Sequence, residues 1–383
     1  METPFKSLIR PVAAVSILIG AAVAALPSIS TAADQVLIGF SAPLTGDNAG
    51  SGQESLNAAR LAVEQINAAG GIMGRQVQLL DGDDRCDPKE AAIVAQKLVA
   101  QKISAAAAHY CSGAALAALP IFKEAGILYV DWGAASSKIP ASGYDKLFIT
   151  IFSGAAPGLY AADMAIHKLG KKKFAMVDDR TPANGEFTVG FQKRATELGG
   201  NVVLSDHVTQ GDKDFSAFVT KVKGSGAEAL YISLYYAEAG LLVRQLRDQQ
   251  VNATLICIDP CMDPQFLQIA GPAAEGVYGI TQPQATELPA AKEFVAAYKQ
   301  KFGKEPGYIG PYAYDGVNVI AAAYSAVGKI DNDAAAKWLK ARTKESPVKG
   351  ITGPLYWSAD GSLPDFKFSV YQVKAGKFQF VGQ

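Results

Sequence analysis

The sequence has little histidine and no excess of charge of either sign. Three of its 383 residues are histidine, and 36 basic side chains balance 36 acidic ones. Without a basic surplus, the chain lacks the electrostatic footprint of a nucleic-acid-binding protein. Hydrophobic residues make up 49% of the chain, which excludes disorder, collagen and coiled coil. We expect a globular protein of two domains, at about 100–200 residues each, with a small molecule as its partner.

Motifs of common enzyme classes are also missing. The patterns GxSxG, GxxxxGK[ST] and HExxH do not occur, so the usual serine nucleophile, phosphate loop and zinc site are not indicated. His109 and Cys111 could pair as base and nucleophile, but no third group is placed to orient them. The sequence therefore predicts no catalytic residue, no cofactor and no metal.

Long apolar runs are missing except near the N-terminus. Residues 12–26 are apolar, follow Lys6 and Arg10, and precede small residues up to Ala33. This run is shorter than the roughly 20 residues that span a bilayer, and its order of basic, apolar and small residues is typical of a secretory signal. We predict a signal peptide over residues 1–33, cleaved near Ala33; an uncleaved anchor helix is the alternative.

Cysteine is scarce, but the number is even. For an exported chain, four cysteines favour disulfides, and three connectivities are possible. We expect Cys86–Cys111 and Cys257–Cys261, because each pair lies within one βαβ stretch. A metal site drawn from Cys257, Cys261, Cys111 and His109 is the alternative, although neither cysteine spacing is CxxC.

Short apolar runs alternate with helical patterns along the rest of the chain. The predicted strands cover residues 35–40, 77–81, 103–108, 127–131, 174–177, 202–204, 229–234, 255–258 and 277–281, with a hairpin over 366–373 and 378–381. The predicted helices cover 53–68, 114–125, 187–198, 215–223, 238–249, 291–302, 312–327 and 333–341, with one more starting at the capping residue Asp87. The pattern predicts an α/β fold of two lobes, each a doubly wound, mostly parallel sheet with helices on both faces.

The helical segments after residue 282 are too few for a third unit, so we expect them to return to the two lobes. The predicted first lobe comprises residues 34–153 and 283–354, and the second comprises 154–282 and 355–383. Crossings near residues 153, 282 and 354 would together form a hinge.

In open parallel sheets, ligands bind beyond the carboxyl ends of the strands. The loops in that position cover residues 41–53, 110–115, 132–137, 235–237 and 259–263. Ser112, at the start of a helix after Tyr110, would bind a carboxylate with help from free amides; the alternative is a simple helix cap. Gly133, after Trp132, permits close approach of a ligand, or belongs to an ordinary turn.

Asp259 is the candidate for a charged contact at the other end of a ligand. A carboxylate that faces an apolar crevice needs a positive partner, which a ligand ammonium can provide. The alternative is a solvated turn aspartate before proline. Of Tyr235 and Tyr236, one is expected to form a wall of the site and the other to pack in the core, since neighbours on a strand face opposite sides.

Several segments together resemble one family. They are Ile38–Gly46 (IGFSAPLTG), Asn67–Ile72, Asp83–Lys89 (DDRCDPK), His109–Ser112, Glu124–Leu128, Lys213–Ser216, Ile269–Gly271 and Gly353–Trp357. In this order they resemble the periplasmic leucine/isoleucine/valine-binding proteins of ABC transporters. The resemblance implies a type I periplasmic binding fold whose lobes close on an amino acid and deliver it to a membrane permease. It also implies a periplasmic monomer and a disulfide that matches Cys86–Cys111.

By this resemblance, Ser112 holds the ligand's α-carboxylate, and the backbone of Gly133, Ala134 and Ala135 contacts its carboxylate and ammonium. Tyr235 is a wall residue, and Asp259 stands where the family has a glutamate facing the ammonium.

Three positions depart from the leucine-type members. Ala135 stands in place of a threonine, Ser51 in place of an aromatic residue, and Asn184 in place of a tyrosine. We expect a pocket that is more polar or roomier than theirs.

The sequence therefore predicts a non-enzymatic solute-binding protein for an amino acid, branched-chain-type or more polar. An aromatic or aliphatic carboxylate, or an amide, is the alternative ligand. A ligand-sensing subunit and an enzyme are the alternative functions.

Overall fold

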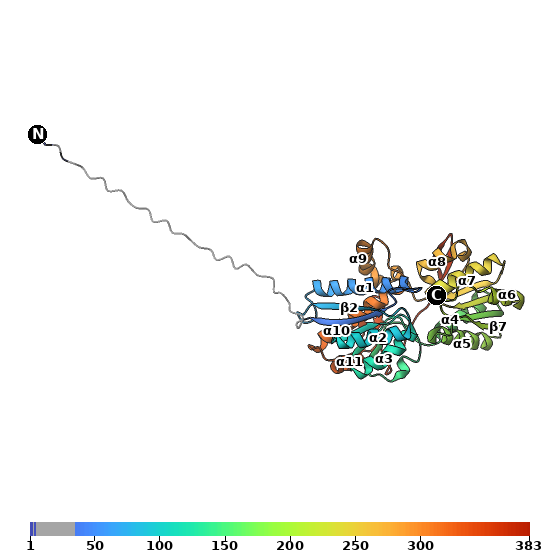
Figure 1. Cartoon of the computed structure of the whole chain (residues 1–383), viewed down its shortest axis with the longest axis horizontal. Coiled ribbons are helices and arrows are strands. Elements are labelled where there is room, and N and C mark those ends of the chain that lie inside the picture. The colour runs from blue at the N-terminus through green and yellow to red at the C-terminus, as the bar shows by residue number, and fades with distance from the viewer. Residues whose placement is uncertain (3, 5–34) are drawn as a thin grey trace.

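The computed structural model describes residues 1, 2, 4 and 35–383. The predicted signal peptide lies almost wholly outside the described residues. Two lobes stand side by side in Figure 1, one carrying the labels α1, α2, α3, α10 and α11 and the other α4 to α8. Each lobe is built on its own β-sheet.

The first lobe contains a parallel five-stranded sheet in the order β2-β1-β3-β4-β5. Its strands are β1 (Val36–Ala42), β2 (Val77–Asp83), β3 (Ala105–Ala108), β4 (Leu128–Asp131) and β5 (Leu147–Ile149). Strands β3, β4 and β5 are buried along their whole length, as expected for a sheet covered on both faces.

The second sheet has seven strands in the order β14-β13-β10-β9-β8-β6-β7. Its strands are β6 (Lys173–Asp178), β7 (Asn201–His207), β8 (Ala229–Ser233), β9 (Thr254–Ile258), β10 (Tyr278–Thr281), β13 (Ser369–Lys374) and β14 (Lys377–Gly382). Strands β6 to β10 run parallel and repeat the strand order of the first lobe, while β13 and β14 add an antiparallel hairpin at the edge. The repeat confirms the predicted doubly wound architecture of both lobes.

Helices cover both faces of each sheet. They are α1 (Ala49–Ala68), α2 (Pro88–Ala100), α3 (Ser112–Glu124), α4 (Ala156–Asp163), α5 (Pro182–Glu197), α6 (Ser216–Ser225), α7 (Tyr236–Asp248), α8 (Pro264–Ala270), α9 (Lys292–Phe302), α10 (Gly310–Val327) and α11 (Asn332–Lys340). Strand β6 shows why two layers form: Phe174 and Met176 join one hydrophobic cluster, while Ala175 and Val177 join the other, because alternate side chains point to opposite faces. Within residues 35–383, no helix has the length and apolarity that a membrane crossing requires.

The chain passes between the lobes after β5, after β10 and again before β13. The crossings near residues 153, 282 and 354 stay a prediction for the position of the hinge. Trp357 Nε1 donates to the Ile149 carbonyl at 2.8 Å, and the Gly361 carbonyl accepts from Ile149 N at 2.9 Å. These bonds keep residues 357–361 against β5 of the first lobe. A short antiparallel pair, β11 (Val348–Lys349) and β12 (Pro354–Leu355), precedes them.

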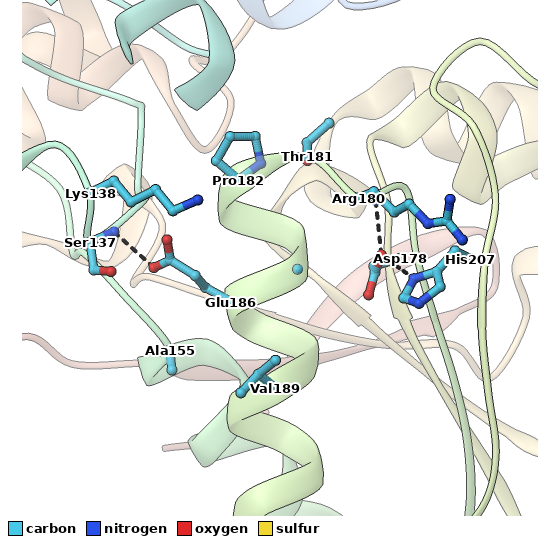
Figure 2. A pocket seen from close by; sticks show the side chains of 11 residues that line it. Ser137, Lys138, Ala155, Asp178, Arg180, Thr181, Pro182, Glu186, Val189 and His207 are labelled. Carbon is cyan, nitrogen blue, oxygen red and sulfur yellow. Dashed lines mark hydrogen bonds and ion pairs between the residues drawn. The ribbon is translucent and has the colours of Figure 1, made fainter.

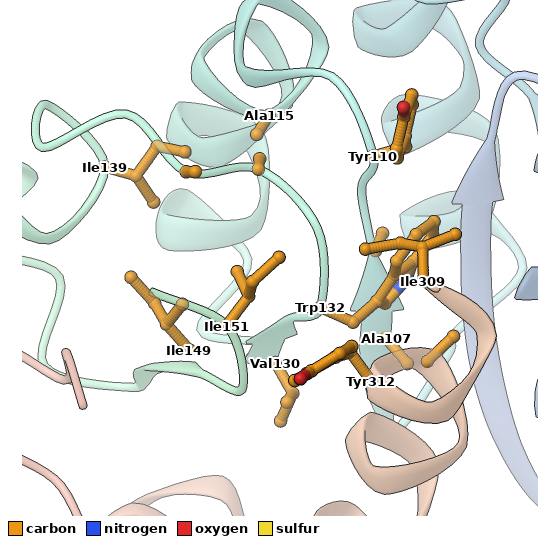
Figure 3. Close-up of a cluster of buried hydrophobic side chains, with 14 of the residues drawn as sticks. Ala107, Tyr110, Ala115, Val130, Trp132, Ile139, Ile149, Ile151, Ile309 and Tyr312 are labelled. Atoms are coloured by element: carbon orange, nitrogen blue, oxygen red, sulfur yellow. The ribbon is translucent and has the colours of Figure 1, made fainter. Parts of the chain in front are cut away.

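A buried aromatic layer supports the loops at the carboxyl ends of β3 and β4. Trp132 is fully buried and stacks on Phe40 with 5.4 Å between ring centroids. Figure 3 shows Trp132 beside Tyr110, Ile309 and Tyr312, so residues from β-strand ends and from α10 meet there. The loops that follow β3 and β4 therefore rest on a packed floor.

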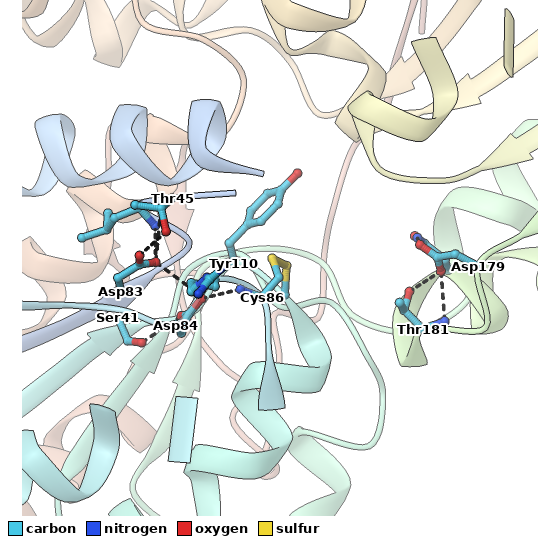
Figure 4. The surroundings of a disulfide bond; sticks show 12 residues. Ser41, Thr45, Asp83, Asp84, Cys86, Tyr110, Asp179 and Thr181 are labelled. Carbon is cyan, nitrogen blue, oxygen red and sulfur yellow. Dashed lines mark hydrogen bonds between the residues drawn. A yellow bond between two sulfur atoms is a disulfide. The ribbon is translucent and has the colours of Figure 1, made fainter. Parts of the chain in front are cut away.

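The cysteines pair as Cys86–Cys111 and Cys257–Cys261, with Cα–Cα distances of 5.3 and 6.1 Å. This confirms the predicted pairing and leaves no free thiol for the alternative metal site. Figure 4 shows the first disulfide with Ser41, Asp84 and Tyr110 around it. Among residues 35–383, no group of three or more His, Cys, Asp or Glu side chains is placed to hold a metal ion.

The two disulfides close loops of very different length, which predicts different contributions to stability. Cys86 and Cys111 are 25 positions apart, whereas Cys257 and Cys261 are 4 apart. Chain-entropy arguments assign about 3.5 kcal/mol to the longer loop and about 2 kcal/mol to the shorter one. Replacing both cysteines of a pair by alanine should therefore lower the free energy of unfolding more for Cys86–Cys111. Urea unfolding of the two double variants measures this, and a larger loss for the short pair would contradict it.

Candidate ligand-binding site

The carboxyl ends of the strands from both lobes meet at one small cavity. Its lining residues come from the loops after β3, β4, β8 and β9 and from the start of α5: Tyr110, Ser112, Gly133, Ala135, Ala183, Asn184, Phe187, Tyr235, Asp259 and Pro260. The cavity volume is about 20 Å³, roughly the space that one water molecule needs. The two lobes are thus closed on each other, with their own side chains filling most of the space between them.

One end of the cavity is suited to an anion. Helix α3 starts at Ser112, and its first amides have no partner within the helix. The Ser112 hydroxyl accepts a hydrogen bond from Ser136 N at 3.1 Å, which ties the loop after β4 to the start of α3. A Cβ atom at Gly133 would lie 2.9 Å from the His109 carbonyl, so the close approach of the two loops requires glycine there.

The amides of the loop after β4 are partly engaged within their own lobe. Gly133 N and Ala134 N both donate to the Asp131 carboxylate, at 3.1 and 2.9 Å. We therefore expect the Ser112 hydroxyl and the first amides of α3, rather than these two amides, to donate to a ligand carboxylate. The positive end of the α3 dipole lies there and favours an anion.

Asp259 contributes a negative group at the same cavity. It follows β9, begins a short 3₁₀ helix (Asp259–Met262), and lies between the two cysteines of the Cys257–Cys261 disulfide. Its side chain is buried, and its Oδ1 atom has no hydrogen-bond partner. Burial raises the pKa of Asp259 to about 7. No ion pair within residues 35–383 includes this carboxylate.

Tyrosines rather than cations surround Asp259. Five tyrosines have a pKa well above the usual value: Tyr110, Tyr231, Tyr235, Tyr308 and Tyr312. Burial is the largest cause for each of them, and the charge of Asp259 is a further cause. The cavity itself contains no lysine or arginine. A carboxylate in such surroundings is poorly compensated, and a positively charged group of a ligand would stabilise its ionised form.

Of the two neighbouring tyrosines, Tyr235 lines the cavity and Tyr236 packs in the second lobe's core. Tyr235 lies against Tyr110 of the first lobe, with 5.7 Å between ring centroids. The residue pattern alone left open which of the two would form the wall; the resemblance favoured Tyr235, and Tyr235 is the one that lines the cavity.

Three predicted site residues do not line the cavity. Trp132 and Ala134 are fully buried behind it, and Ser51 donates its hydroxyl to Asp263 at 2.8 Å across the lobes. The structure adds Ala183, Phe187 and Pro260 as lining residues. Pro260 lies in a loop that was selected, and Phe187 in a helix that was expected, but neither was chosen as a site residue. Ala183 was not predicted because the helix now assigned to α5 was expected to begin only at residue 187. The Thr181-Pro182 pair, with proline at the first helical position, is the start signal that could have extended it.

Hydrogen bonds on two sides of the cavity join the lobes. On one side, the Ser51–Asp263 bond is accompanied by Gly50 N, which donates to the Tyr236 hydroxyl at 3.0 Å. On the other, Glu186 of α5 accepts from the Ser136 hydroxyl at 2.6 Å and from Ser137 N at 2.8 Å. Figure 2 shows Glu186 reaching from α5 to Ser137. These bonds hold the closed arrangement.

A two-lobed fold with an inter-lobe cavity defines a binding protein of the hinged type. The sequence profile described as "Periplasmic binding protein" matches residues 35–377. The chain therefore belongs to the periplasmic binding protein family, as the sequence resemblance indicated. This family is extracytoplasmic, and its members are solute-binding proteins rather than enzymes.

Relatives within the family share nearly the full length. The chain is 32% identical to the leucine-, isoleucine-, valine-, threonine- and alanine-binding protein of Pseudomonas aeruginosa, over 92% of this chain and 93% of that protein. It is similar to the branched-chain amino acid transporter substrate-binding protein LivJ from Streptococcus pneumoniae, solved with isoleucine (30% identity, TM-score 0.82, covering 91% and 100% of the chains). It is also similar to an ABC-transporter solute-binding protein from Rhodopseudomonas palustris solved with 3,4-dihydroxybenzoic acid (26% identity, TM-score 0.81, covering 91% and 96%).

Glu186 should help to keep the lobes together. Glu186→Ala removes the charged acceptor of two hydrogen bonds between the lobes. Because these bonds are partly exposed, we expect the ratio of closed to open molecules to fall by about tenfold. Small-angle X-ray scattering should then report a larger radius of gyration. Glu197→Ala, on the same helix but bonded only to Arg194 of its own lobe, is the matched control. Equal radii for the two variants would contradict the role of Glu186.

Proposed function

We propose that this protein is the solute-binding component of an ABC importer, which captures an amino acid between its lobes and delivers it to a membrane permease. One observation carries the proposal: Asp259 is buried at the cavity with an unpartnered oxygen and no cation beside it. The start of α3 and the Ser112 hydroxyl lie at the same cavity. Acceptor and donors together match the two charges of an α-amino acid.

The physical basis of capture would be the burial of both charged ends. The ligand carboxylate would gain charge-assisted hydrogen bonds at the start of α3, and its ammonium would compensate Asp259. Closure is stabilised by as much as the ligand prefers the closed arrangement. The amino-acid ligands named for the Pseudomonas aeruginosa and Streptococcus pneumoniae relatives support this proposal.

An aromatic carboxylate is the second candidate ligand. Tyr110, Tyr235 and Phe187 give the cavity aromatic walls, and the Rhodopseudomonas palustris protein was solved with a dihydroxybenzoic acid. Such a ligand would bring a negative charge toward Asp259 with nothing to offset it, which disfavours ionisation of both groups. The amino acid therefore accounts better for the charges of the site.

Asp259→Asn tests the ammonium contact. The asparagine keeps the shape but removes the charge, so affinity for an amino acid should fall by about 100-fold. Affinity for the same molecule without its amino group should change little. Calorimetry on L-alanine and propionate measures both, with Asp214→Asn, on an exposed turn of the second lobe, as control. Equal losses for the two ligands would remove the assigned role of Asp259.

Amino-acid binding should depend on pH through Asp259. With a pKa of about 7, the unliganded carboxyl is protonated below neutral pH, and the ammonium prefers its ionised form. Affinity should therefore fall by about tenfold per pH unit below 7 and level off above it. The surrounding tyrosines stay protonated throughout, since their pKa values are raised. Calorimetry between pH 5.5 and 8 measures the slope; the same slope in Asp259→Asn would assign it to another group.

A further inference from the structure

Two buried carboxylates, one from each lobe, lie beside the same contact between the lobes. Glu54 belongs to α1 of the first lobe and is 5% exposed, whereas Asp263 caps α8 of the second lobe and is 2% exposed. Ser51, one turn before Glu54 on α1, donates its hydroxyl to Asp263 Oδ2 at 2.8 Å. Residues three apart on a helix share a face, with about 5–6 Å between their Cβ atoms. The closed arrangement therefore brings the two carboxylates near each other.

The backbone of the first lobe fixes Glu54 in this position. Its Oε1 atom accepts a hydrogen bond from Gly310 N, at the start of α10, at 2.7 Å. A Cβ atom added at Gly307 would lie 2.3 Å from Glu54 Oε2, so the loop before α10 passes directly over the carboxylate. Glu54 cannot turn away from the contact without losing these neighbours.

No close cation compensates the two carboxylates. Within residues 35–383, neither Glu54 nor Asp263 forms an ion pair. The other charged and titratable groups around them are Lys304, Tyr236, Tyr298 and Tyr308. Lys304 is exposed, so solvent and salt screen its charge. Burial is the main cause that raises the pKa of the three tyrosines, which therefore stay neutral.

Closure of the lobes makes Glu54 harder to ionise. Burial first, and the charge of Asp263 second, raise the pKa of Glu54 to about 8. Burial also raises the pKa of Asp263. Two carboxylates at one buried contact repel each other when both are ionised. When the lobes separate, Asp263 leaves with the second lobe, and the pKa of Glu54 should fall. A proton on Glu54 therefore favours the closed arrangement.

We infer that Glu54 and Asp263 form a pH-sensitive latch, which keeps the lobes together while Glu54 carries a proton and releases them when both carboxylates are ionised. The latch acts on the unliganded protein, so it goes beyond the proposed function and does not depend on which solute binds. Its contribution to closure is complete below the pKa that Glu54 has in the open protein. That contribution is lost as the pH rises through about 8.

Small-angle X-ray scattering of the unliganded protein between pH 7 and 9.5 tests the latch. Asp259 is also buried and has a pKa of about 7, so every protein compared carries Asp259→Asn. In this background, the ratio of closed to open molecules should fall by up to about tenfold per pH unit above 8, and the radius of gyration should increase. Glu54→Gln keeps an oxygen for Gly310 N but cannot titrate, so its radius should stay at the closed value.

Two further variants locate the effect. Asp263→Asn keeps an oxygen for the Ser51 hydroxyl and for the cap of α8 but removes the opposing charge, so its lobes should stay closed to a higher pH. Glu64→Gln, at an exposed position of the same helix, is the matched control and should open as the background does. Circular dichroism at each pH verifies that the proteins are folded.

The outcomes are independent of amino-acid binding, because no ligand is present. A radius that stays constant in the background between pH 7 and 9.5 would overturn the latch, and so would an equal increase in Glu54→Gln. Either result would leave the proposed solute-binding function untouched.

Discussion

The burial of one carboxylate without a cation is the constraint on which this account depends. Asp259 has lost most of its contact with water, and neither a lysine nor an arginine lines its cavity. Burial shifts its pKa to about 7, which shows how unfavourable its ionised form is in these surroundings. A ligand that brings a positive charge relieves this cost, and a neutral or anionic ligand does not. The proposed ligand class, an amino acid, therefore rests on this uncompensated carboxylate.

The fold places this group where a second lobe can enclose it. Both sheets use the same strand order, so the carboxyl ends of β3 and β4 on one side face those of β8 and β9 on the other. Rigid parts surround the cavity: the aromatic layer beneath Tyr110, and the disulfide that flanks Asp259. Between the lobes, the Ser51–Asp263 bond is buried, whereas the Glu186–Ser137 bond is exposed. Rigid surroundings within each lobe favour rigid-body movement of the lobes about the passages between them.

Much of the fold could be predicted from the sequence, because its signals are local. Alternating apolar runs and helix starts such as Asp87-Pro88 identified most strands and helices, and the cysteine pairing followed from chain order. Strand β5 and helix α4 were missed, since β5 is three residues long and α4 begins amid small residues. The Trp357–Ile149 bond could not be predicted, because it joins residues distant in the sequence.

The site could be predicted only in part, because some of its contacts join residues that are distant in the sequence. The rule about strand ends identified the loops, and seven of the ten predicted ligand residues line the cavity. The rule could not show that Asp131 engages the amides of Gly133 and Ala134, or that Ser51 bonds to Asp263 instead of facing a ligand. The Ser51–Asp263 bond is a tertiary contact that no local pattern encodes. The Asp131 bonds span only two and three positions and form a local turn of the kind that aspartate favours, so the sequence could have indicated them.

A crystal structure of the protein with a bound amino acid tests the central claim most directly. We expect the ligand nitrogen within about 3 Å of Asp259 Oδ1, a hydrogen-bond distance, and the ligand carboxylate at the start of α3. A ligand bound in this cavity with its nitrogen turned away from Asp259, or bound at another place on the molecule, would contradict the account.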